Sequence, residues 1–207
     1  MTETNTRDTK LIQYLNEAYG KEKELETALE AHIALTTRDA YKKRLKDHLR
    51  ETKAQSKGLE RRIKQLGGSV ELLATIQAAA SKAVAATKGP LHAIRGTSEP
   101  EKMLKNAKTE FSEEHEEIAN YNAIETLADA VGDKETAKLA REYRRQEERM
   151  AKFLDRTIVT LTKEVARKEI PAAERNGGRK RSTTRKRSTT TRKRSGTTRK
   201  RSTAQKR

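Results

Sequence analysis

The sequence contains no cysteine and no tryptophan, and aromatic residues make up only 3% of its 207 positions. Without cysteine, disulfides, thiolate catalysis and zinc–cysteine sites are excluded. No apolar run approaches the roughly 18–20 residues that a membrane-spanning helix needs. The N-terminal stretch MTETNTRDTK is polar and lacks the apolar segment of a secretory signal. We therefore expect a soluble, cytoplasmic protein with no membrane partner.

The residues that are abundant are those of long helices. Charged residues make up 37% of the chain and hydrophobic residues 32%, with Ala, Leu, Glu, Lys and Arg dominant. Apolar residues recur at helical spacing in four segments, over about residues 8–35, 37–66, 98–131 and 133–168. Ser98 and Glu101 have the spacing of a capping box at the start of the third segment. The sequence therefore predicts an all-α protein.

The lengths of the connections predict how these helices are arranged. The first and second segments are joined by a short link, as are the third and fourth, whereas about 30 residues separate the second from the third. Two hairpins joined by one long crossover are typical of ferritin-like four-helix bundles. We expect a flexible N-terminus over residues 1–7, the bundle over 8–170 and a disordered tail over 171–207.

The tail differs from the rest of the chain in charge and composition. Between Arg175 and Arg207 there are 15 Lys and Arg and no acidic residue, whereas the preceding residues hold 32 cations against 30 anions. The unit Arg-Lys-Arg-Ser occurs four times in this segment. A polar, self-repelling segment cannot bury enough apolar surface to offset the entropy of ordering, so the tail is expected to be disordered.

A repeated cationic segment binds polyanions because it releases their condensed counterions. The tail has no aromatic residue for base stacking and no rigid element to read base edges. We therefore expect non-specific DNA binding and association with the nucleoid, with RNA as an alternative ligand. The predicted phosphate contacts are Arg179, Lys180, Arg181, Arg185, Lys186, Arg187, Arg192, Lys193, Arg194, Arg199, Lys200 and Arg201.

The third helical segment contains ionisable residues within its apolar stripe. In the stretch FSEEHEEIANY (Phe111–Tyr121), Phe111, Ile118 and Tyr121 fall on one face. Glu114 and His115 each lie three or four residues from both Phe111 and Ile118. The spacing therefore predicts that both side chains point into the core.

The other three helices repeat this feature. Glu22 and Glu147 lie at the centres of the apolar stripes of the first and fourth helices, and His48 lies in that of the second, with Glu51 one turn later. Glu22 and Glu147 each lie about 14 residues into their helices, and the groups on the second and third helices lie about 14–19 residues from the ends of theirs. In antiparallel hairpins these positions fall at one height.

Several ionised carboxylates in one core need compensation, because burying each costs several kcal/mol unless it is paired. Two divalent cations would supply it, and bundle cores are known to hold such pairs with ligands from all four helices. Carboxylate and imidazole ligands suit iron, with manganese or zinc as alternatives. A metal-free buried network, with Tyr143 and Arg144 as partners, is the competing interpretation.

Two motifs carry a resemblance to a known family. H-L-x-E-T-x-x-Q (His48–Gln55) and E-H-x-E-I-A-x-Y (Glu114–Tyr121) make residues 8–168 resemble the YciF-type ferritin-like family of bacteria, long labelled a domain of unknown function. The resemblance implies a ferritin-like bundle, often a homodimer, with a di-iron or similar dinuclear site and a link to the stress response. It implies metal ligands among Glu22, His48, Glu51, Glu114, His115, Glu117 and Glu147.

The sequence departs from the broader ferritin-like pattern. The usual Glu-x-x-His pair occurs nowhere in the chain: the second helix has His48 and Glu51 in the reverse order, and Met150 stands three residues after Glu147. Gln55 could serve as a neutral ligand or as a donor to one. These departures predict at most weak ferroxidase or peroxide-consuming activity.

The bundle and the tail together predict a DNA-associated stress-protection protein that binds iron. The alternative is a metal-free, nucleoid-associated architectural protein whose bundle dimerises and whose tails bridge DNA. A third possibility, an oxygenase, would require an open substrate pocket.

Overall fold

The structure, a computed structural model, describes residues 5–70 and 98–175. These form the helices α1 (Thr6–Leu35), α2 (Asp39–Gln65), α4 (Glu99–Ala130), α5 (Lys134–Glu169) and the short α6 (Ala172–Arg175). The prediction of an all-α four-helix bundle is confirmed. Most of the crossover and most of the predicted tail, including all twelve predicted phosphate contacts, lie outside the described residues.

Local sequence signals set the ends of the helices. The side chain of Asn5 accepts a hydrogen bond of 2.9 Å from the backbone three residues on, so α1 begins two residues earlier than predicted. Asp133 caps α5 in the same way at 3.0 Å. Gly67 (φ 85°) and Gly132 (φ 76°) follow α2 and α4 in the left-handed conformation that glycine adopts readily.

The predicted capping box at the start of α4 does not form. Ser98 occupies the N-cap position, but its side chain makes no capping hydrogen bond. Its hydroxyl donates instead to the carboxylate of Glu169 at the end of α5. A tertiary contact has therefore replaced the local one that the sequence predicts.

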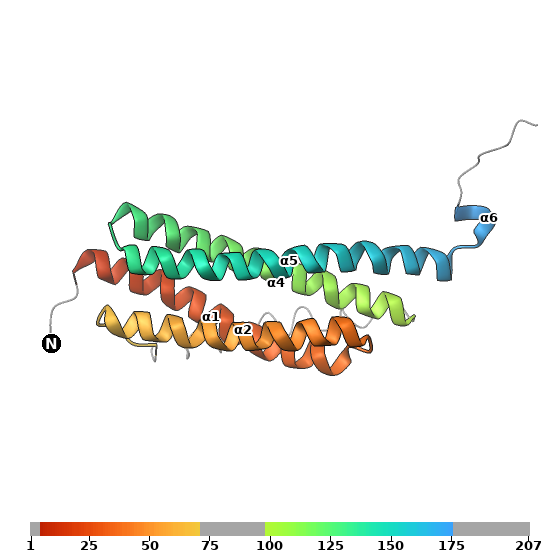
Figure 1. The fold of residues 1–207 in the computed structure, drawn as a ribbon, viewed down its shortest axis with the longest axis horizontal. Helices are drawn as coiled ribbons and strands as arrows, with labels where there is room; N and C mark the ends of the chain where they lie inside the picture. The colour runs from red at the N-terminus through yellow and green to blue at the C-terminus, as the bar shows by residue number, and fades with distance from the viewer. Residues whose placement is uncertain (1–4, 71–97, 176–207) are drawn as a thin grey trace, which may run out of the picture.

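The helices form two antiparallel hairpins, α1–α2 and α4–α5, which lie side by side (Figure 1). α1 packs against α2 and α4, and α5 packs against α4 and α2, so that α1 lies diagonally opposite α5 and α2 opposite α4. The four helices thus surround one common core. Among the described helices, none combines the length and the apolar content that crossing a membrane requires.

Two large apolar clusters fill the core, with a polar band between them. Cluster one contains Leu25, Leu29, Leu45, Met150 and Leu154, and cluster two contains Leu15, Leu59, Ile63, Tyr121 and Tyr143, each with further members. Each long helix passes from one cluster to the other, and buried polar side chains occupy the middle. The wide apolar surfaces on both sides supply the packing that keeps this polar band dry.

Gly58 makes room on α2 for a side chain of α5. A Cβ atom built on Gly58 would lie 1.8 Å from the hydroxyl oxygen of Tyr143. We expect Gly58→Ala to destabilise the protein by about 1–3 kcal/mol, because overpacking outweighs the better helix propensity of alanine. Urea unfolding followed by circular dichroism measures the change.

The double variant Gly58→Ala/Tyr143→Phe is the matched control. Without the hydroxyl, the nearest atom of residue 143 lies 3.0 Å from the new Cβ, so most of the lost stability should return. A Gly58→Ala protein as stable as the parent would show that the contact between α2 and α5 is not tight.

Candidate metal centre

Three fully buried side chains from three helices meet at the centre of the polar band. His48 Nε2 on α2 lies 2.9 Å from Glu114 Oε1 on α4 and 3.5 Å from Glu147 Oε2 on α5. All three side chains are 0% exposed. Each offers one ligand atom, and these atoms lie within 4.8 Å of one another. This trio could therefore hold a metal ion.

α1 and α4 add a second group of carboxylates to the band. Glu22 is 0% exposed and Glu117 3%. The hydroxyl of Tyr121, which is itself fully buried, donates to Glu22 Oε1. Among the described residues, Oε2 of both Glu22 and Glu117 has no hydrogen-bond partner. One oxygen of Glu22 is therefore held by Tyr121, while its other oxygen has no hydrogen-bond donor among the described residues.

The two carboxylates of the trio also have one oxygen each without a hydrogen-bond donor. Gln55 on α2 donates to Glu147 Oε1, which fixes that carboxylate. Oε2 of Glu114 and of Glu147 has no hydrogen-bond donor among the described residues, although the latter lies within ion-pair distance of His48. The two carboxyl groups can hydrogen-bond each other when one of them is protonated. Buried polar atoms are rarely left without partners. Two such oxygens beside one imidazole make a donor set that could hold a metal ion.

Glu51 lies at the edge of this centre rather than inside it. Its side chain is 32% exposed and one oxygen lies 3.3 Å from His48 Nδ1 and 3.0 Å from Arg44. The hydrogen bond from His48 and the charge of Arg44 lower the pKa of Glu51 to about 2. A carboxylate hydrogen-bonded to a ligating imidazole orients that imidazole. The geometry favours this role for Glu51 over direct ligation.

His115 does not point into the core, and the prediction that it would is wrong. It is exposed, its Nδ1 lies 2.8 Å from the carbonyl oxygen of Phe111, and its ring packs 4.2 Å from the Phe111 ring. Successive residues on a helix are rotated by about 100°. With Glu114 directed inward, its neighbour is carried to the surface, and a spacing of three or four residues cannot decide between them.

The metal-free alternative predicted Tyr143 and Arg144 as partners of the buried carboxylates, and the structure places both elsewhere. Arg144 does not reach the core: its guanidinium pairs with Glu125 at 3.0 Å and with Glu148 on the surface. Tyr143 packs edge-on against Tyr121 at 5.6 Å. Glu114, Glu147 and Glu22 pair instead with His48, Gln55 and Tyr121, respectively.

Sequence reasoning missed a further buried carboxylate one turn before Glu114. Glu110 is 0% exposed, accepts a hydrogen bond of 2.7 Å from the hydroxyl of Tyr41, and lies 2.8 Å from His32 Nδ1. Burial opposes protonation of His32, but Glu110 outweighs it and raises the pKa of His32. The available signal was the i, i+4 spacing of Glu110 and Glu114, which places both on one helix face.

Burial and mutual repulsion hold protons on the centre. Burial, with repulsion from Glu117 and Glu147, raises the pKa of Glu22 well above the usual carboxyl value. Burial also raises the pKa of Glu147, partly opposed by His48, and raises that of Glu117 to about 8. Burial alone would lower the pKa of His48, but Glu114 outweighs it, so this pKa is raised well above the ordinary value.

These pKa shifts determine whether the stability of the metal-free chain rises or falls with pH. Unfolded carboxyl groups titrate near pH 4.3 and unfolded histidine near 6.5, whereas the pKa of Glu117 in the fold is about 8. The folded chain therefore binds more protons than the unfolded chain between about pH 4.3 and 8, so its stability should fall as the pH rises through that range. Thermal unfolding of the metal-free protein at a series of pH values measures this.

A metal ion should reverse the trend, because it replaces the protons on its ligands. The rise in melting temperature on adding Mn(II) or Zn(II) is therefore expected to be larger at pH 8 than at pH 5.5. The matched control, Glu22→Gln/Glu147→Gln, should show a weaker pH dependence and no rise on adding metal. An equal rise at both pH values in the parent would contradict ligation by these groups.

Fold and centre together define a four-helix bundle with a buried carboxylate–histidine cluster. The family is also shown: residues 6–167 match the domain of unknown function DUF892, so the chain belongs to that family. No curated protein matches the sequence.

Solved structures with the same fold come from several bacteria. A protein of Xanthomonas campestris pv. campestris is 24% identical over 80% of this chain and 99% of its own, with a TM-score of 0.63. The Escherichia coli stress protein YciF is 19% identical over 77% and 99%, with a TM-score of 0.65. YcfI of Rhodopseudomonas palustris is 21% identical over 74% and 96%, with a TM-score of 0.59. At these identities the likeness establishes the fold alone.

Proposed function

We propose that this protein binds iron in the bundle core and protects nucleic acid to which its cationic tail attaches it. The observation that carries the proposal is the buried trio of His48, Glu114 and Glu147, which meets from three helices and leaves one oxygen of each carboxylate without a hydrogen-bond donor. A buried polar atom without a partner is costly, and a bound cation would supply the missing partner of both oxygens.

The residues divide into ligands and groups that position them. His48, Glu114 and Glu147 would hold one ion, and Glu22 and Glu117 extend the donor set toward a second. Bound iron would supply one-electron chemistry with dioxygen or peroxide. Tyr121 and Gln55 fix the carboxylates of Glu22 and Glu147 through their hydrogen bonds, and the apolar clusters on both sides exclude water.

Nucleic acid enters the proposal through the tail. The four Arg-Lys-Arg-Ser units supply twelve cations with no intervening acidic residue, and arginine favours bidentate contacts with phosphate. Iron-driven radicals damage nucleic acid, so a protein that consumes Fe(II) or peroxide beside it would be protective. The description of YciF as a stress protein is consistent with such a role.

Metal analysis of the purified protein tests the core of the proposal. We expect one or two ions per chain after incubation with Fe(II) under anaerobic conditions and removal of free metal. The variant Glu22→Ala/Glu147→Ala should retain none, whereas Glu148→Ala, which removes an exposed carboxylate beside Glu147, should retain all of it. Consumption of Fe(II) and peroxide should follow the metal content.

A specific observation favours a second function. His48 in its protonated form already pairs with Glu114 and Glu147, so the core could be stable without a metal. The protein would then be architectural: two copies would dimerise through their bundles, and their tails would bridge DNA segments. A metal-free bundle that stays folded, does not take up Fe(II) and compacts DNA would support this function over the first.

A further inference from the structure

The four long helices divide their charges between two opposite sides of the bundle. The neighbours α2 and α5 together carry 21 Lys and Arg against 11 Asp and Glu, whereas α1 and α4 carry 7 against 15. Of the glutamates buried in the core, only Glu147 belongs to the first pair. One face of a nearly neutral bundle is therefore strongly basic, and this face is built from folded residues rather than from the tail.

On α5 the cations follow one another along a single stripe. Arg141 has a side chain 40% exposed and pairs with Glu125 at 2.6 Å. The other six members are exposed and make no ion pair with any described residue. The stripe recurs every three or four residues and consists of Lys134, Lys138, Arg141, Arg145, Arg149, Lys152 and Arg156.

This pattern differs from that of an ordinary solvated helix. Like charges three or four residues apart destabilise a helix, whereas opposite charges stabilise it. α1 follows the stabilising pattern, since Lys23 pairs with Glu26 at 2.6 Å and Lys21 with Glu24 at 3.4 Å. The stripe on α5 instead places like charges side by side through most of the helix, an arrangement that an anionic partner would relieve.

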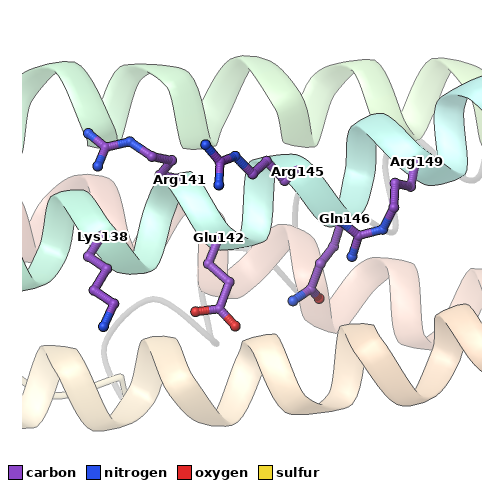
Figure 2. Close-up of a pocket in the computed structure, with 6 residues that line it drawn as sticks. All are labelled: Lys138, Arg141, Glu142, Arg145, Gln146 and Arg149. Atoms are coloured by element: carbon purple, nitrogen blue, oxygen red, sulfur yellow. The ribbon is translucent and has the colours of Figure 1, made fainter.

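The middle of the stripe borders a shallow hollow of about 590 Å³ (Figure 2). In Figure 2 the side chains of Arg141 and Arg145 extend away from α2, while those of Lys138 and Glu142 extend toward it. The hollow is lined by Lys138, Arg141, Glu142, Arg145, Gln146 and Arg149. Four cations around a recess with one acidic group suit phosphate oxygens.

We propose that the basic stripe of α5, with the hollow beside it, forms a docking surface (the basic face) for the phosphate backbone of duplex DNA, in addition to the tail. At 1.5 Å per residue, the stripe from Lys134 to Arg156 spans about 33 Å, or the length of about ten base pairs. A duplex presents one negative charge per ~1.7 Å along this length. The chain continues from α5 through α6 into the cationic tail, so face and tail can engage one duplex.

The inference rests on the proposed DNA association, and the test uses the full-length chain with its tail. In the face variant K138Q/R145Q/R149Q/R156Q, four cations of the stripe lose their charge. We expect its affinity for a 30-base-pair duplex of random sequence to fall at least ten-fold at 50 mM salt, measured by fluorescence anisotropy. The log–log salt slope should become shallower by about 3–4 if all four contact phosphate.

The matched control K10Q/K23Q/K102Q/K108Q removes four exposed cations from α1 and α4. Its net charge equals that of the face variant, so an effect of overall charge would weaken both equally. We expect the control to bind DNA within two-fold of the parent and with an unchanged salt slope. Equal losses in the two variants would overturn the docking surface.

The other outcomes separate this inference from the proposed function. If the parent binds DNA and the face variant binds equally well, the docking surface is wrong and the tail alone carries the binding. If the parent does not bind DNA, the DNA association itself fails. If the face variant instead loses a salt-sensitive self-association in sedimentation, the basic face binds the acidic α1/α4 face of a second copy and the DNA assignment is overturned.

Discussion

Replacing His48 with alanine is expected to destabilise the metal-free protein by about 3–5 kcal/mol and to abolish metal binding. His48 is fully buried and lies 2.9 Å from Glu114 and 3.5 Å from Glu147. Its removal would leave two carboxylates in the core without their cationic partner, which is among the most costly changes to a buried ion pair. It would also remove the only imidazole among the converging ligand atoms of the described residues.

His115→Ala is the matched control. This histidine lies one residue from Glu114 and is exposed, and its hydrogen bond and its ring contact are both made to Phe111 on its own helix. Its replacement should change the free energy of unfolding by no more than about 0.5 kcal/mol and leave metal content unchanged. Urea unfolding at pH 6.5, where His48 is expected to be protonated, and metal analysis of both variants give the comparison.

The stability measurement and the metal analysis can each contradict a different part of this prediction. A His48→Ala protein of unchanged stability would mean that water or a metal, and not the imidazolium, compensates Glu114 and Glu147. If the variant is destabilised but still takes up stoichiometric metal, the ion is held by carboxylates alone. Loss of metal from His115→Ala and not from His48→Ala would contradict the assignment of the centre.

The parts of the centre that could be predicted from sequence are those fixed by helix periodicity over several turns. Glu22 and Glu147 each have apolar neighbours on both sides along one face, so their burial followed from the pattern, and His48 followed in the same way. The matching of heights across the helices followed from two short connections. The same features made the four-helix bundle predictable before any side-chain contact was known.

The parts that could not be predicted depend on rotation about a helix axis and on contacts between distant elements. A rotation of one residue decides between Glu114 and His115, and packing against neighbouring helices sets it. The network of Glu110 with Tyr41 and His32 joins three helices. In the sequence, each of these three residues has the pattern of an ordinary surface or interfacial residue. No local pattern therefore indicates that their side chains meet.

The burial of glutamates in this core also affects the electrostatic potential at the surface of the bundle. Four of the buried carboxyl groups come from α1 and α4, so they lie in the core and not on the basic face. In the metal-free chain, burial favours the protonated form of Glu22 and Glu117, and a bound divalent cation would compensate the charge of the deprotonated groups. In either state little negative field from the core reaches the surface. The centre and the basic face are therefore electrostatically compatible, and one bundle can hold cations inside while attracting a polyanion outside.

Replacing all twelve Lys and Arg of the four Arg-Lys-Arg-Ser units with glutamine is expected to lower the affinity for DNA by about 10³-fold or more at 150 mM salt. Neutralising six to eight phosphates gives a log–log salt slope of about −5 to −7, and that contribution disappears with the charges. The loss should exceed that of the face variant, because three times as many cations are removed. Anisotropy titrations across a range of salt concentrations measure both quantities.

A tail of the same composition in scrambled order is the control for sequence-specific recognition. Because counterion release depends on charge density and not on residue order, this protein should bind DNA within about two-fold of the parent. The glutamine variant should keep its metal content and its unfolding midpoint, since the predicted ligands all lie between Glu22 and Glu147. Loss of binding in the scrambled protein would show that the repeated Arg-Lys-Arg-Ser order itself is read, and a fall in metal content in the glutamine variant would show that tail and core are coupled.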